Sequence, residues 1–368
     1  MIEDLKIARE STKIETELEE VEVKVYVENY SSRDIPLVEV VDIVPEHLIL
    51  KGKPAAAITL PPRGSAVFSY RVRPLLPGSY TFSDLEVHVY GPLGFFKTQR
   101  VVSSPTTVTV LPYYSRVGVS LRSLEKLWGL VVRGRATSGM YDIADFREYS
   151  PGDDYRKIVW KTLARTGRVF VREDFGEVRA RILLMLDVRS WDWNLGEPPN
   201  TLASVELRVL RSLIHSLVGS GNQVDLAICC SATTKVVRNA ERDVERALAE
   251  VFSYITPHCY CASHLGIFAE APVYMGRSPS EYSAVILVAN PVSIAVENPA
   301  RFMDLVKVYG DRLKLVIPRF DYELYVDRGD LGRFYRAVAD LMEKAGGGVE
   351  IIEESMYLRI PGGIEKWR

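Results

Sequence analysis

The sequence has little that marks a membrane-spanning or nucleic-acid-binding protein. Its longest apolar runs, such as Ile182–Leu186, fall well short of the roughly 18 residues that cross a bilayer. Basic and acidic residues nearly balance, 46 against 48, so no overall field favours nucleic acid or a membrane surface. The charged first residues Met1–Glu10 do not form a signal peptide. The sequence therefore predicts a cytoplasmic protein, and a membrane tether upstream of Met1 stays open as an alternative.

Cysteine is also scarce, with four residues in two tight groups. Cys229 and Cys230 end a predicted buried strand, where cysteine usually serves as a small apolar side chain. Residues 258–264, HCYCASH, have the residue types of a metal site but lack the paired C-x₂-C spacing of structural zinc sites. Disulfide pairing among the four stays open.

A catalytic constellation is missing as well. Ser138 and Ser150 have no histidine nearby in the sequence, so no nucleophile is matched with a base at short range. The sequence predicts that the protein is not an enzyme and has no cofactor.

Residues 1–112 have the pattern of a β domain. Apolar and polar residues alternate through Val21–Val27, VEVKVYV, with the period of a half-buried strand. Turn residues separate further expected strands, and short strands at this spacing favour an antiparallel β-sandwich. The expected strands are 21–27, 37–44, 66–72, 80–90 and 106–111.

Residues 113–180 are predicted to form a connecting segment, and residues 181–368 an α/β domain. In the connecting segment we expect helices at Ser120–Trp128 and from Asp153 to Gly167, with an irregular stretch over 130–149. In the α/β domain, nearly all-apolar strands favour a central sheet that is covered on both faces. The expected strands are 181–187, 224–230, 235–238, 284–289, 313–317 and 349–353, with helices over 202–218, 242–255, 300–308 and 331–345. The expected strands at 224–230 and 235–238 are too close in the sequence for a helical crossover between them. They are therefore predicted to form an antiparallel hairpin.

The most informative stretch is 138–187, where acids and bases alternate with aromatics. On a helix that begins at Asp153, Lys157, Lys161 and Arg165 would form one basic stripe. This stripe could stabilise the helix end or could dock an anionic surface of a partner. The residues that stand out are Arg147, Glu148, Asp153, Arg156, Trp160, Lys161 and Arg165.

This run resembles the signature of the domain-of-unknown-function 58 family, R-E-Y-x-P-G-D-x-x-R-x-I-D-W-K-x-x-A-R. One departure is Val159, which stands where the family has aspartate. The resemblance implies a β-sandwich joined to a von Willebrand factor A-like doubly wound α/β domain. It also implies a MoxR-type AAA+ ATPase as a partner, and it carries no enzyme activity.

The resemblance further implies a metal-ion-dependent adhesion site after the first α/β strand, with the form D-x-S-x-S. Here Asp187 is present, but Arg189 and Trp191 replace the two serines. Ser263 and Asn290 are the weak candidates for the remaining ligands, because Mg²⁺ prefers several oxygen donors. Arg189 is expected to pair with Asp187 in place of a metal.

Arg189, Trp191 and Trp193 lie in the loop that should crown the sheet. Exposed tryptophan beside arginine is typical of interface hot spots, and the alternative is that both rings are buried. We therefore expect a non-catalytic adaptor that binds protein and no nucleic acid. The alternative is a divalent-metal-dependent binder or enzyme that uses a degenerate site at Asp187.

Overall fold

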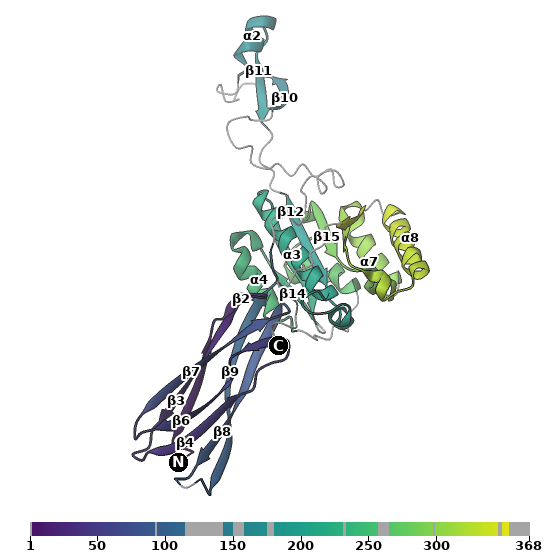
Figure 1. Cartoon of the computed structure of the whole chain (residues 1–368). Helices are drawn as coiled ribbons and strands as arrows, with labels where there is room; N and C mark the ends of the chain where they lie inside the picture. The colour runs from purple at the N-terminus through teal and green to yellow at the C-terminus, as the bar shows by residue number, and fades with distance from the viewer. Residues whose placement is uncertain are drawn as a thin grey trace.

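The computed structural model describes residues 2–92, 94–114, 143–149, 158–174, 180–230, 233–256, 265–296, 299–344 and 348–352. Figure 1 shows an elongated β-rich part joined to a part in which helices flank a sheet. The β-rich N-terminal half and the α/β C-terminal half expected from the sequence are both present. In the described residues, no helix is long and apolar enough to cross a membrane.

The N-terminal β module consists of two sheets that share one apolar core and is sandwich-like. Alternation explains how each strand faces this core: in β3, Val21, Val23, Val25 and Val27 are at most 1% exposed while the residues between them face outward. One sheet has the order β1-β3-β7-β5 and the other β2-β9-β8-β4-β6. The strands are β1 Leu5–Ser11, β2 Ile14–Thr16, β3 Val21–Asn29, β4 Ile35–Asp42, β5 Leu48–Lys51, β6 Ala55–Leu60, β7 Ser65–Pro74, β8 Gly78–Tyr90 and β9 Lys97–Leu111.

The α/β module contains a six-stranded sheet with the order β14-β13-β12-β15-β16-β17. All neighbouring strands are parallel except β14, which forms the expected antiparallel hairpin with β13. Strand β15 is buried at every position, as expected for a strand covered on both faces. The strands are β12 Arg181–Asp187, β13 Gln223–Cys230, β14 Thr233–Val237, β15 Ala284–Val288, β16 Leu313–Pro318 and β17 Gly348–Ile352.

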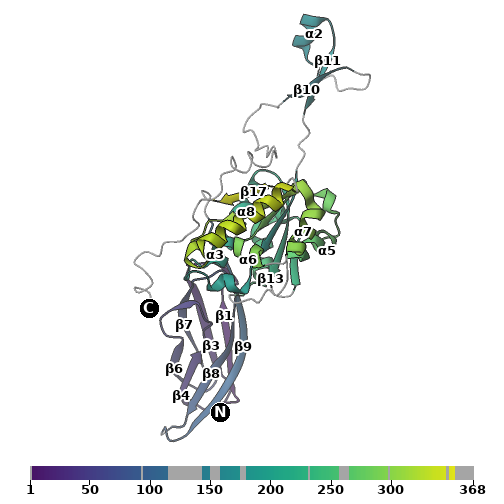
Figure 2. The same cartoon turned by 90° about the vertical axis from the view of Figure 1, so that its right-hand side faces the viewer.

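The helices of this module flank the sheet in both views (Figures 1 and 2). Their apolar residues join those of the strands in one core, to which Cys229 also belongs. The longer helices are α3 Leu202–Gly219, α4 Val244–Phe252, α7 Pro299–Tyr309 and α8 Arg328–Lys344, with the short α5 Ala271–Tyr274 and α6 Pro291–Val296 between them.

A third unit carries part of the sequence motif. Strand β10 Ile143–Glu148 pairs antiparallel with β11 Phe170–Asp174, and the short helix α2 Trp160–Thr166 precedes β11. The irregular stretch expected over 130–149 is thus wrong for its last residues, because β11 supplies a pairing partner that local sequence does not reveal. Asp153 itself lies outside the described residues, but one continuous helix from Asp153 to Gly167 is wrong. Ile158 forms a β-bridge with Val171, and the described helix begins at Trp160.

Two of the expected elements fall entirely outside the described residues. These are the helix at 120–128 and the histidine- and cysteine-rich run 258–264. The expectations for the β module missed the strands β1, β2, β5 and β6, and they began β9 nine residues too late. All four of these strands lie at the edge of a sheet, where strand propensity depends strongly on context.

Candidate functional site

The carboxyl edge of the parallel sheet is the place where open α/β sheets usually bind ligands. Strand β12 ends there at Asp187, and Asn290 follows the neighbouring strand β15. Because Leu186 pairs in register with Val288, the two side chains lie at the same edge. Both residues are fully buried. The edge therefore presents an enclosed polar cluster.

The side chain of Arg189 lies against the carboxylate of Asp187. Its Nε donates a hydrogen bond of 2.6 Å to Asp187 Oδ2, and the arginine is only 5% exposed. The guanidinium also lies 5.8 Å from the centre of the Trp191 ring. The ion pair expected between Arg189 and Asp187 is thus present.

Two further acids, Asp192 and Glu206, complete what we call the acid cluster (Asp187, Asp192 and Glu206). Asn290 bridges them, because its Nδ2 donates to Asp192 Oδ1 at 3.1 Å and to Glu206 Oε1 at 2.8 Å. Asp192 Oδ2 accepts from the backbone N–H of Arg189 at 2.7 Å. Asp192 lies in the 3₁₀ turn η2, Ser190–Asn194, and Glu206 in α3.

Burial controls the charge of these acids. It raises the pKa of Asp192 to about 8, and the neighbouring Asp187 carboxylate raises it as well. Burial and then the charge of Asp192 hold the pKa of Glu206 well above its usual range. Removing an isolated carboxylate from water costs several kcal/mol, roughly, so a buried acid keeps its proton instead. Near neutral pH the cluster thus holds protons that free carboxyl groups would have lost.

The weak metal candidates are only partly brought together. Asp187 and Asn290 lie at the cluster, whereas Ser263 is outside the described residues. Within the described ranges, no three His, Cys, Asp or Glu side chains are grouped so that they could hold a metal ion. The acid cluster is thus a hydrogen-bonded network that holds protons and is paired with one cation, the Arg189 guanidinium.

The two tryptophans of this loop differ. Trp193 is 4% exposed and belongs to the core of the α/β module, so the alternative that the ring is buried is confirmed for Trp193. Trp191 is partly buried beneath Arg189. The 3₁₀ turn η2 buries Asp192 and Trp193 and leaves Ser190 and Trp191 partly exposed. Of the partner-binding loop predicted at Arg189, Trp191 and Trp193, Trp191 alone is partly exposed.

The motif residues that the structure describes lie in the β10–β11–α2 unit. Arg147 and Glu148 are in β10, and Asp153 and Arg156 are outside the described residues. Trp160 is the first residue of α2 and is 62% exposed, and Lys161 and Arg165 are exposed on the same helix. The motif therefore presents an aromatic ring and two cations to its surroundings.

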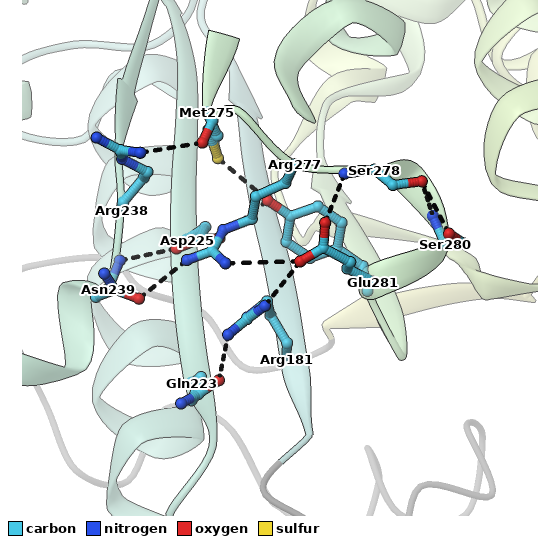
Figure 3. A network of polar contacts seen from close by, with 11 residues as sticks. Arg181, Gln223, Asp225, Arg238, Asn239, Met275, Arg277, Ser278, Ser280 and Glu281 are labelled. Carbon is cyan, nitrogen blue, oxygen red and sulfur yellow. Dashed lines mark hydrogen bonds and ion pairs between the residues drawn. The ribbon is translucent and has the colours of Figure 1, made fainter. Parts of the chain in front are cut away.

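A second polar network lies at the amino edge of the sheet, where Asp225 is its centre (Figure 3). This buried carboxylate accepts from Tyr282 Oη at 2.9 Å and from the backbone N–H of Asn239 at 2.7 Å, and it lies 2.8 Å from Arg277 Nε. These contacts fasten the segment after α5 to β13. We interpret the network as structural, since ligands bind open α/β sheets at the opposite edge.

Sequence reasoning missed Asp192, Glu206, Glu17 and Arg208. A signal for two of them was available in α3, where LASVELRVLRSLI places charges among residues that are otherwise apolar on all sides. Glu206 is fully buried and Arg208 is 1% exposed. Charged residues are almost never buried unless they are paired, so each of them required a partner elsewhere in the chain.

The fold and the site define a protein with a sandwich-like β module and an α/β module whose ligand-binding edge is filled by its own side chains. Residues 145–311 match the model of a family described as "Protein of unknown function DUF58". This region of the chain thus matches the family that the motif indicated.

Comparison with solved structures finds distant likenesses, two of which follow. The CARDB domain of a Pyrococcus furiosus protein, solved with di-metal ions, is 17% identical over 29% of this chain and 92% of that one, with a TM-score of 0.21. Salmonella alpha-2-macroglobulin reacted with methylamine is 13% identical over 30% of this chain and 7% of that one, with a TM-score of 0.25. Likeness at this level carries no argument about fold or function. No curated protein matches the sequence.

Proposed function

We propose that this protein is a non-catalytic adaptor that binds other proteins and works with a MoxR-type AAA+ ATPase. The observation that carries the proposal is the ion pair between Arg189 and Asp187. It supplies a cation from the chain itself at the position where a related site would hold a metal. A site filled in this way favours binding through other surfaces over metal chemistry.

The α/β module is proposed to be von Willebrand A-like. Its strand order, with five parallel strands and the antiparallel β14 at one edge, supports this assignment. So does the aspartate at the end of the central strand β12. On this view, the carboxyl edge is a degenerate metal-ion-dependent adhesion site. Calorimetry that found micromolar binding of Mg²⁺, abolished by Asp187→Ala, would contradict the proposal.

The docking surface is proposed to be the exposed side of α2, with Trp160, Lys161 and Arg165. Tryptophan and arginine are over-represented at interface hot spots, while paired cations favour an acidic partner surface. Among the side chains of the α2 unit that the structure describes, few are buried. Val171 is buried, whereas Ile158, Val159, Leu163 and Phe170 are only half-buried. Two strands with one short helix gain stability when another surface covers them.

The test is the affinity of the purified ATPase for the whole chain, with and without nucleotide. Trp160→Ala and the double charge reversal Lys161→Glu/Arg165→Glu should each weaken binding at least about tenfold, because each removes a hot-spot contact. Lys307→Glu, at a 71% exposed lysine of α7, is the matched control and should bind as the wild type does. Absence of wild-type binding in every nucleotide state would refute the ATPase as the partner.

A further inference from the structure

One arginine joins the β module to the loop beside the acid cluster. Arg208 of α3 donates to both carboxylate oxygens of Glu17, from Nε at 2.6 Å and from Nη2 at 2.8 Å. The same guanidinium donates to Pro199 O at 2.6 Å and to Asn200 Oδ1 at 2.9 Å. Glu17 lies between β2 and β3, so these four bonds join the β module, α3 and the loop before α3.

The Glu17–Arg208 pair is enclosed, since each residue is only 1% exposed. Glu17 also accepts from the backbone N–H of Tyr113, just after β9. A buried ion pair holds together only while both charges are matched, because loss of one partner leaves the other charge unpaired in a low-dielectric site. Separating Glu17 from Arg208 is therefore costly, and the pair stabilises the contact between the two modules.

The loop that Arg208 holds is the continuation of the segment carrying Asp192. Residues 195–200 connect η2 to α3, and the backbone N–H of Leu202 donates to Leu195 O at 2.8 Å. At its turn, Gly196 has a φ of +90° and lies so close to Phe320 and Asn200 that a side chain would collide. Because the loop is short and tightly packed, fixing Pro199 and Asn200 also restrains the η2 turn.

We infer that the Glu17–Arg208 contact is a latch through which the β module keeps the carboxyl edge of the sheet closed. While the latch is made, the 195–200 loop is fixed beside the acid cluster and the edge where open α/β sheets bind ligands stays enclosed. When a partner or a mechanical load moves the β module, Arg208 loses Glu17, the loop is released and the acid cluster meets solvent. This coupling between modules goes beyond the adaptor role and does not depend on which partner binds.

Hydrogen exchange of the intact chain tests the latch. Glu17→Gln keeps the shape of the side chain and removes its charge. It should speed exchange of the amides in 188–201 by at least about tenfold, since losing a hydrogen bond between charged groups shifts a local opening equilibrium by that factor or more. Amides of β3 and α4 should exchange as in the wild type. Glu17→Asp keeps the charge but shortens the side chain, so that the carboxylate lies farther from Arg208. It should give the same local increase and replaces Glu17→Gln in the experiment if that variant fails to fold.

Two controls separate the latch from simpler roles. Glu20→Gln alters a nearby acid of the same module, which pairs with Lys51 and Arg73 at its surface, and should leave 188–201 unchanged. Arg208→Met removes the bonds to both Glu17 and the loop. If Arg208→Met loosens the loop while both Glu17 variants do not, Arg208 holds the loop without the β module and the latch is refuted. A uniform rise in exchange over both modules would refute it as well.

Discussion

At the scale of single residues, the unusual feature of this protein is how many carboxyl groups it buries around one guanidinium. Asp187, Asp192 and Glu206 are all fully buried, and Arg189 forms an ion pair with Asp187. Three ionised acids beside one cation would leave two uncompensated charges, which burial makes very costly. The raised pKa values of Asp192 and Glu206 follow from this imbalance.

This imbalance predicts that the α/β module loses stability as the solution becomes more alkaline. Asp192 has a carboxyl pKa of roughly 4 when unfolded and of about 8 when folded. A raised folded pKa contributes stability that is complete below the unfolded value and is lost as pH rises through the folded value. Between these two pKa values, the free energy of unfolding falls as the pH rises. For each acid that keeps its proton, the fall is up to about 1.4 kcal/mol per pH unit.

Urea titrations between pH 5 and pH 9, in roughly unit steps, measure this slope. Glu206→Gln keeps an acceptor for Asn290 and cannot ionise, so the slope should be smaller than in the wild type. Glu323→Gln, at an acid whose side chain is 53% exposed, is the control and should leave the slope unchanged. Equal slopes in wild type and Glu206→Gln would mean that Glu206 does not hold a proton.

Gly196 gives a second prediction at this scale. Its φ is +90°, and a Cβ there would lie 2.5 Å from Asn200 O and 3.2 Å from the Phe320 ring. Gly196→Ala should therefore destabilise the α/β module by about 1–3 kcal/mol, measured by urea unfolding. Gly219→Ala, at the last position of α3 with open space around it, should be neutral or slightly stabilising. A neutral Gly196→Ala would show that the loop can relax.

At the scale of elements, the sequence predicted best where one periodicity extends over a whole strand or helix. The alternation of β3 and the all-apolar runs of β12 and β15 were visible directly, and so was the hairpin of β13 and β14. Strand β10 was missed, since its pairing with β11 depends on residues far along the chain. Of the acid cluster the sequence indicated only Asp187, together with Asn290 beside it. The positions of Asp192 and Glu206 depend on how η2 and α3 return to the sheet.

The helix α2 yields a prediction about the position where the chain departs from its family. Val159 is the N-cap residue of α2, and no side chain there accepts a hydrogen bond from the helix. Aspartate at an N-cap satisfies a free backbone N–H and stabilises a helix by about 0.5–2 kcal/mol. Val159→Asp should therefore slow hydrogen exchange of the α2 amides severalfold. Val159→Ala, which offers no acceptor, should give no such gain, and equal exchange in the two variants would exclude capping at this position.

At the scale of the whole molecule, the β module and the α/β module share core residues across their boundary. Leu76 and Leu111 belong to strands or turns of the β module but are buried in the core of the α/β module. Polar contacts reinforce this junction, since Ser79 N donates to Ile255 O at 2.6 Å and Arg211 donates to Pro112 O. The end of β9 is thus structurally part of both modules.

Two matched truncations test this sharing. Leu111 is 2% exposed in the core of the α/β module, while Leu85 is fully buried in the core of the β module alone. Each Leu→Ala change should cost about 2–5 kcal/mol through lost burial and the cavity left behind. Hydrogen exchange, measured for the amides of each module as the temperature rises, separates the two cases. Leu85→Ala should weaken the β module first, whereas Leu111→Ala should weaken α3 and β12 although the residue belongs to a β-module strand. Leu111→Ala could instead leave the α/β amides as protected as in the wild type. The two modules would then be stable independently of each other, and movement of one could not be transmitted to the other through this junction.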